Sequence, residues 1–187
     1  FYHRLSEKVH LTLNWSHDLV QLSRANDHNY QKNEINFAHL IDEVLAQMLD
    51  LANAKKIDLC FLDEHRQIAE NIWLQADGAL LMRAFINLIS NALRYSPSLS
   101  EVRIELMDDF DVHDSLPNGQ RNYFVCRIVD QGCGMSSAQV EQLHNGRSSA
   151  ATLDVHNTPD AAQRLGIGFL MAKTVVSRHA GYVRVES

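Results

Sequence analysis

The chain has 187 residues, of which 45% are hydrophobic, and a formal net charge of −6 at pH 7. This length fits one ordinary domain with a helical appendage, and the hydrophobic content is sufficient for a packed core. The negative charge and the lack of a polybasic run argue against a nucleic-acid partner. The three cysteines form no CxxC pair, which excludes a disulfide framework or a zinc site and is typical of a reducing compartment.

The first part of the chain, residues 1–27, is predicted to form one long helix. Apolar residues recur there at roughly helical spacing, among them Leu5, Val9 and Leu13, and no Gly or Pro interrupts them. The apolar stripe of such a helix needs a partner, either a second helix or another subunit. No run in the sequence reaches the roughly 20 apolar residues that cross a bilayer. Because the chain begins at Phe1, we expect it to be a piece of a longer protein.

The middle of the chain is predicted to contain a helix, two short strands and a second helix, over residues 37–54, 58–62, 71–75 and 78–95. The second helix follows Asp77, a candidate N-cap, and ends before Pro97, which prevents its continuation.

The last third is predicted to contain two strands around a polar loop, an irregular segment, a helix and a final strand, over residues 102–107, 108–120, 123–129, 141–163, 167–180 and 182–186. This order of elements indicates an α/β fold. We expect a two-layer sandwich of one mixed β-sheet with about three helices.

Two amides lie four residues apart in the apolar helix 78–95. Asn87 and Asn91 are therefore expected on one helix face, one turn apart. An amide oxygen is a neutral, hard ligand that suits a magnesium ion shared with phosphates. Arg94 and Tyr95 extend the region with a cation for phosphate and a ring for stacking. An isolated NxxxN pair is more simply explained as the polar side of a solvated helix.

The segment 130–135, Asp-Gln-Gly-Cys-Gly-Met, follows the strand predicted at 123–129. A carboxylate at a strand end can accept a hydrogen bond from the exocyclic amine of adenine. The two glycines allow positive φ and the close approach of a ring to the backbone. Taken alone, the segment is more simply an Asp-Gly turn that ends a strand. Cys133 is then either a reactive thiol or a small filler.

The segment 166–169, Gly-Ile-Gly-Phe, is expected to open the last predicted helix. Glycines there would leave bare amides and the positive end of the helix dipole for an anion. A simple tight turn is the alternative. Lys173, further along the helix, either reaches a phosphate or is a solvated residue. Together the three segments supply what a nucleotide site needs: a magnesium ligand, a group that reads the base, and open backbone for phosphates.

The order and spacing of these segments resemble the asparagine box and the two glycine boxes of the ATP-binding domain of sensor histidine kinases. This domain belongs to a superfamily with gyrase, heat-shock chaperones and mismatch-repair ATPases. The resemblance extends to residues 76–78 and 179–187, and it covers roughly residues 34–187. It implies a Bergerat-type ATP-binding fold with ATP and Mg²⁺ as ligands.

The resemblance also implies roles for single residues. Asn91 would bind magnesium, Asn87 would support the metal or the phosphates, and both are the catalytic candidates. Asp130 would read the adenine amino group. The remaining nucleotide contacts are expected from Arg94, Tyr95, Gly132, Gly134, Met135, Gly166, Ile167, Gly168 and Phe169.

One position separates branches of that superfamily. In its ATP-hydrolysing members, a glutamate one turn before the magnesium asparagine activates water. This chain has Asn87 there, and an amide cannot take a proton. The site is therefore better suited to hold ATP for transfer than to hydrolyse it. We expect a protein-histidine kinase fragment, whose phosphoryl group passes on to an aspartate of a response regulator receiver domain.

Two departures from the kinase pattern keep alternatives open. Residues 142–146 replace a phenylalanine-rich segment, and Arg164 stands where the kinases have a further glycine. The alternatives are a degenerate nucleotide-binding scaffold, or pseudokinase, and an ATPase of the superfamily.

Ser16-His17-Asp18 looks like the start of a phosphoacceptor box. Only residues 19–27 remain before a polar exit, which is too short for the second helix of the family's dimerisation hairpin. We therefore expect residues 1–30 to be the end of that second helix, with the acceptor histidine outside the chain. The resemblance implies a homodimer through this helix, and a cytoplasmic domain at 34–187 in a phosphoprotein anchored in the inner membrane.

Overall fold

The computed structural model of the chain describes residues 31–107, 124–144 and 162–187. The predictions for 1–30, including His17, for the loop 108–120 and for most of 141–163 lie outside these residues. The described elements are β1 (Asn33–Asn36), α2 (Phe37–Lys55), β2 (Asp58–Phe61), α3 (Asp63–Ala69), β3 (Trp73–Ala76), α4 (Gly78–Tyr95), β4 (Glu101–Met107), β5 (Val125–Val129), α5 (Ser137–His144) and α6 (Ala162–Arg178).

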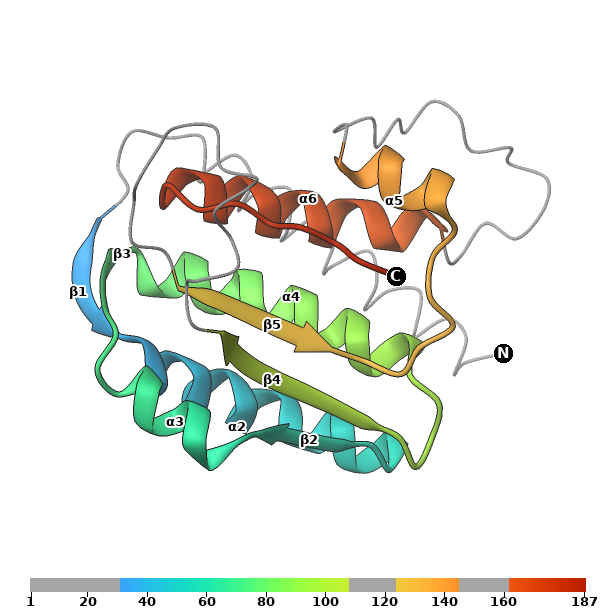
Figure 1. The fold of residues 1–187 in the computed structure, drawn as a ribbon, viewed down its shortest axis with the longest axis horizontal. Helices are drawn as coiled ribbons and strands as arrows, with labels where there is room; N and C mark the ends of the chain where they lie inside the picture. Colours follow the sequence, from blue (N-terminus) through green and yellow to red (C-terminus); the bar gives the residue numbers. More distant parts are fainter. Residues whose placement is uncertain (1–30, 108–123, 145–161) are drawn as a thin grey trace, which may run out of the picture.

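The described elements form an α/β sandwich of two layers, as the sequence predicted. The sheet has the order β2-β4-β5, in which β4 runs parallel to β2 and antiparallel to β5, so the sheet is mixed. Helices α2, α4 and α6 lie side by side and cover one face of this sheet (Figure 1). Helix α4 occupies the centre of the helical layer.

Apolar and charged residues alternate along β4, so they point to opposite faces of the sheet. Val102, Ile104 and Leu106 are buried beneath the helices. The intervening residues form ion pairs on the opposite face, where Arg103 Nε lies 3.4 Å from Glu105 Oε1. One face of the sheet is therefore apolar and the other is solvated, as is usual for a two-layer fold.

Phe37 lies at the centre of the core, where it is fully buried. Its ring packs edge to face on Phe85 of α4 and on Phe124, with ring centroids 5.8 and 4.7 Å apart. Aromatic pairs in this geometry are favourable beyond the burial of their surface. The contact joins α2, α4 and the chain entering β5.

Helix α4 occupies the predicted range, residues 78–95. The Asp77 side chain caps it, because Oδ1 accepts a hydrogen bond from the backbone N–H of Leu80 at 3.1 Å. The predicted helix 37–54 corresponds to α2, which ends one residue later.

The single sheet expected from the sequence is divided in two. β1 and β3 form a separate antiparallel pair, with Asn36 opposite Trp73. The prediction missed β1 because its sequence, Asn-Glu-Ile-Asn, is short and polar. Helices α3 and α5 were also missed, since each has only 7 or 8 residues.

Two predictions for the end of the chain are wrong. The last helix begins at Ala162 instead of residue 167, so Gly166 and Gly168 lie inside α6. The buried side chains of Met171, Ala172 and Val175 pack on the core and compensate for the low helix propensity of glycine. Residues 182–186 are not a strand, because alternation in the sequence does not supply a hydrogen-bonded neighbour.

Candidate functional site

Helix α4 carries one of the three sequence motifs and contacts the other two. A Cβ atom added to Gly168 of α6 would lie 3.7 Å from Cβ and Cγ of Asn87. A Cβ added to Gly132 would lie 3.2 Å from the carbonyl oxygen of Tyr95. The structure therefore brings all three segments to the same helix, on the side that faces α6 and at its C-terminal end (Figure 1).

Asn87 and Asn91 are both half-buried on α4. The Asn87 amide is held, since Nδ2 donates a hydrogen bond to Sδ of Met171 at 3.1 Å. Within the described part of the chain, the amide of Asn91 has no hydrogen-bond partner. At the end of the helix, Arg94 is exposed and Tyr95 is half-buried. One amide is thus fixed against α6 while the other is available to a ligand.

The segment 130–135 forms a turn closed by its own aspartate. Asp130 Oδ1 accepts a hydrogen bond from the N–H of Gly132 at 2.8 Å, as in an Asx turn. Gly134 has φ of +70°, a conformation that favours glycine. The N–H of Met135 donates to Ser187 Oγ at 2.6 Å. The turn uses one carboxylate oxygen of the exposed Asp130, and the other can face a ligand.

The segment 166–169 does not have the predicted local structure. It was expected to open a helix with bare amides, but it lies within α6, where backbone N–H groups bond to carbonyls one turn earlier. Phe169 is buried, with 7% of its surface exposed. Gly168 still belongs to the site region, because a Cβ at this position would lie in ordinary contact distance, 3.7 Å, of the Asn87 side chain.

His179 connects the two ends of the motif region, a role that the sequence did not reveal. Its Nε2 accepts a hydrogen bond from the N–H of Asp77 at 3.0 Å, and Nδ1 donates to the carbonyl of Val175 at 2.8 Å. Burial lowers the pKa of this imidazole below its usual value, and Lys32 adds to the effect. The ring is therefore neutral, as its acceptor role requires. The sequence indicated this contact only indirectly: residues 76–78 and 179–187, which contain Asp77 and His179, are both part of the family resemblance.

Lys55 of α2 fixes the other end of α4. Its Nζ donates to the carbonyl oxygens of Leu93 and Arg94 at 2.7 and 2.8 Å. The last carbonyls of a helix lack partners within the helix and carry the negative end of its dipole, so a cation there is favourable. Lys55 and His179 thus hold opposite ends of the helix that carries the candidate amides.

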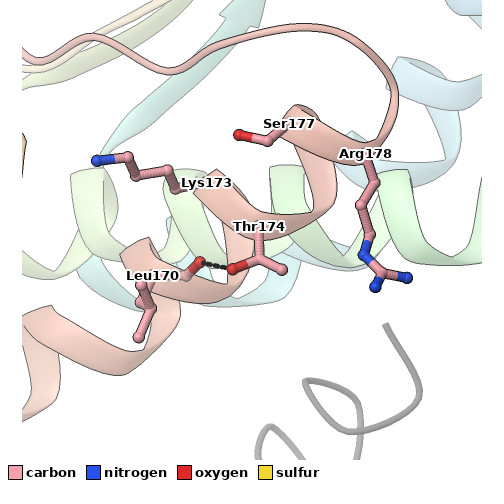
Figure 2. A pocket seen from close by; sticks show the side chains of 5 residues that line it. All are labelled: Leu170, Lys173, Thr174, Ser177 and Arg178. Atoms are coloured by element: carbon pink, nitrogen blue, oxygen red, sulfur yellow. Dashed lines mark hydrogen bonds between the residues drawn. The ribbon is translucent and has the colours of Figure 1, made fainter. Parts of the chain in front are cut away.

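A shallow pocket of about 380 Å³ lies on the outer side of α6 (Figure 2). Its lining residues are Leu170, Lys173, Thr174, Ser177 and Arg178. Thr174 Oγ1 is satisfied by the carbonyl of Leu170 at 2.8 Å, and Lys173 Nζ lies 3.4 Å from the carbonyl of Leu143. None of the three motif segments lines this pocket, so we place the candidate site at α4 instead.

The amides of α4 are a donor set that a magnesium ion could share with phosphate oxygens. Among the described residues, no cluster of three or more His, Cys, Asp or Glu side chains is found. Magnesium commonly keeps several waters and takes one or two protein ligands together with phosphate oxygens. The amide oxygens of Asn87 and Asn91 fit such a shared site.

Comparison with known families identifies the family of the chain. The family model described as histidine kinase-, DNA gyrase B-, and HSP90-like ATPase matches residues 76–187, which is more than half of the chain. The match begins just before α4 and includes all three motifs. The chain belongs to this family.

Curated relatives are named as a histidine-protein kinase/phosphatase and as a sensor protein. The signal transduction histidine-protein kinase/phosphatase MprB of Mycobacterium sp. (strain KMS) is 27% identical over 172 residues, covering 90% of this chain and 28% of the relative. The heme sensor protein HssS of Staphylococcus saprophyticus is 26% identical over 154 residues, covering 82% of this chain and 28% of the relative. The chain thus spans little more than a quarter of these proteins.

Solved structures with the same fold include histidine kinases. Acinetobacter baumannii AdeS matches with a TM-score of 0.57 at 17% identity, covering 94% of this chain and 72% of that one. The mycobacterial sensor histidine kinase MprB matches with a TM-score of 0.55 at 19% identity, covering 83% and 85%. The chain therefore has the fold of a histidine kinase catalytic domain. Among the described residues, no helix combines the length and apolar composition needed to cross a bilayer.

Proposed function

We propose that this chain is the ATP-binding catalytic part of a sensor histidine kinase, which transfers the γ-phosphoryl group of magnesium-ATP to a histidine outside the chain. From there the group passes to an aspartate of a response regulator receiver domain. Family membership and the histidine-kinase names of relatives such as MprB support this reading. The observation that carries it is the amide of Asn87, held against α6 at the position where hydrolysing members have a carboxylate.

Phosphoryl transfer needs positioning and charge neutralisation more than covalent chemistry from the protein. When bound, magnesium would neutralise charge on the phosphate oxygens, with the amide oxygen of Asn91 as its protein ligand and Asn87 supporting the metal or the phosphates. Asp130 would accept a hydrogen bond from the adenine amine, and Gly132 would leave room for the ring beside the end of α4. Arg94 and Tyr95, at the end of that helix, would flank the nucleotide.

The absence of a general base at position 87 explains why ATP would survive until an imidazole is offered. A carboxamide has no basic lone pair that can take a proton from water at neutral pH, whereas a carboxylate does. The bound γ-phosphoryl would therefore be transferred and not released.

The proposal predicts the behaviour of two matched variants at position 87. With magnesium-ATP, the wild-type chain should release almost no phosphate. Asn87→Glu should raise phosphate release above this background, and Asn87→Gln, of similar size but neutral, should not. Steady hydrolysis by the wild-type chain would support an ATPase instead. Acid-labile label on His17 would show that the acceptor lies within the chain.

A second candidate is a nucleotide-binding scaffold that regulates a partner by occupancy. It is favoured by the position of Gly166 and Gly168 inside α6, where their amides bond within the helix and are not open to phosphates. Such a scaffold would bind nucleotide and fail to phosphorylate a supplied dimerisation domain that carries the acceptor histidine.

The same proposal extends to the rest of the protein. Residues 1–30 would be the end of the second dimerisation helix, and 34–187 the catalytic domain. The full protein would be a homodimeric phosphoprotein anchored in the inner membrane, with this part in the cytoplasm. Crosslinking of the full protein through cysteines placed along residues 1–27 would test the dimer.

A further inference from the structure

A buried methionine holds one of the two candidate amides. Met171 lies on the side of α6 that faces α4, and its side chain is fully buried. Its Sδ accepts a hydrogen bond from Asn87 Nδ2 at 3.1 Å. The proposed phosphotransfer assigns no role to this residue.

The contact distinguishes the two ends of the Asn87 carboxamide. A thioether sulfur can accept a hydrogen bond and has no hydrogen to donate. Rotation of the amide by 180° would place Oδ1 against Sδ, where two acceptors meet and the hydrogen bond is lost. Met171 therefore selects the orientation in which Nδ2 contacts the sulfur and Oδ1 does not.

Gly168 supports this orientation one turn earlier on α6. A Cβ at this position would lie 3.7 Å from Asn87 Cγ and 3.9 Å from its Oδ1. With glycine there, no side chain covers the oxygen from that direction. Residue 168 therefore places no side chain against the amide oxygen, while the nitrogen is engaged by Met171.

We propose that Met171 is a positioning residue, which fixes the Asn87 carboxamide with its oxygen available to nucleotide-bound magnesium. This inference rests on the proposed function and sharpens it. Asn87 then contributes its oxygen to magnesium. Its Nδ2 is not the principal hydrogen-bond donor to the phosphates, because it is bonded to Met171. Oxygen is the atom that magnesium prefers, so the orientation suits the ligand.

The chain offers a matched control, a second hydrogen bond from an amide to a methionine sulfur, on α4, the helix that carries Asn87. Met82 of α4 accepts a hydrogen bond from Gln47 Nε2 of α2 at 3.2 Å. Met82→Leu removes the same kind of contact away from the candidate amides. Met171→Leu is the test variant, because exchanges between Met and Leu are among the best tolerated in protein cores. Met171→Ile is a second variant with the same loss of the acceptor.

The first measurement needs no nucleotide. The side-chain NH₂ signals of Asn87 are identified in the NMR spectrum of the apo chain by their loss in Asn87→Ala. Met171→Leu should shift these signals and speed their hydrogen exchange, and Met82→Leu should leave them unchanged. Unchanged Asn87 signals in Met171→Leu and Met171→Ile would overturn the positioning role.

The second measurement is the affinity for a non-hydrolysable ATP analogue with and without magnesium. Met171→Leu should reduce the gain in affinity due to magnesium by about threefold to tenfold, the effect of one lost hydrogen bond. Its affinity without magnesium should match that of the wild type. Equal losses in both conditions would show a packing role only and overturn the inference. If the wild-type chain binds no analogue, the proposed function fails, while the NMR result still reports whether Met171 orients the amide.

Discussion

The imidazole of His179 accepts a hydrogen bond from the backbone N–H of Asp77 at 3.0 Å, across 102 residues of sequence. Asp77 in turn caps the start of α4 through its side chain. The end of α6 is thereby attached to the start of the helix that carries Asn87 and Asn91. The attachment requires a neutral ring, because a protonated Nε2 would donate and could not accept.

This contact predicts a pH dependence of stability. Burial lowers the pKa of His179 from the ordinary value of 6.5, with Lys32 lowering it further and the Val175 carbonyl and Asp77 opposing the shift. Well above pH 6.5 the ring is neutral in both the folded and the unfolded chain. Below it, the unfolded chain takes up the proton first, so the free energy of unfolding should fall until the folded-state pKa is reached.

Urea unfolding of the wild type and of His179→Gln between pH 8 and pH 5 measures this effect. Glutamine can place an acceptor oxygen near Nε2 and does not titrate. The wild type should lose more stability on acidification than His179→Gln. Parallel pH profiles for the two proteins would mean that His179 does not contribute as described.

Two glycines beside α4 should respond to alanine in opposite ways. In Gly132→Ala the new Cβ would lie 2.7 Å from Asp130 Oδ1 and 3.2 Å from the Tyr95 carbonyl, so the turn must shift, at a cost of about 1 kcal/mol or more. In Gly168→Ala the nearest atom is at 3.7 Å, and the higher helix propensity of alanine should stabilise α6 by up to about 1 kcal/mol. Denaturant unfolding of both variants tests the pair. A destabilised Gly168→Ala would show that α6 lies closer to α4 than described.

Lys55 should stabilise α4 from its C-terminal end. Lys55→Met removes two hydrogen bonds to the carbonyls of Leu93 and Arg94 and should lower the free energy of unfolding by about 1 kcal/mol. Lys56→Met makes the same change of charge at the next, exposed residue and should have a smaller effect. Equal losses in the two variants would indicate a general charge effect instead of a contact with the helix end.

The sequence predicted the elements whose signals are local. Helix α4 has strong apolar periodicity, a capping aspartate and a following proline, and the structure agrees with the prediction at both ends. The final helix was misplaced because Gly166 and Gly168 look like a turn when only local propensity is considered. Packing of Met171 and Val175 on the core outweighs that propensity, and this packing depends on contacts distant in sequence.

In the candidate site, too, local sequence patterns could be predicted and contacts between distant residues could not. Its motif residues could be selected from spacing and resemblance, and the structure brings the three segments to α4. The contacts of Met171, His179 and Lys55 could not be predicted, because each joins residues that are 38 to 102 positions apart. Their residue types are also common in positions without any such role.

Cys133 provides a probe of the site. It is exposed in the segment 130–135, whereas burial raises the pKa of Cys126 to about 12, and burial with the Glu101 contact raises that of Cys60 to about 11. Iodoacetamide should therefore modify Cys133 first, since the thiolate is the reactive form. Magnesium-ATP should slow this reaction several-fold, as measured by mass spectrometry of the peptides. Modification of Cys133 at the same rate with and without ATP would place the nucleotide elsewhere.

The most direct test of the account is calorimetry of a non-hydrolysable ATP analogue, with and without magnesium, on the wild type, Asn91→Ala and Asp130→Asn. The wild type should bind more tightly with magnesium. Asn91→Ala should lose most of that gain, at least tenfold for a metal ligand. Asp130→Asn should weaken binding in both conditions, because an amide is a poorer partner for the adenine amine than a carboxylate. Undiminished magnesium dependence in Asn91→Ala, or no binding by the wild type, would contradict the account.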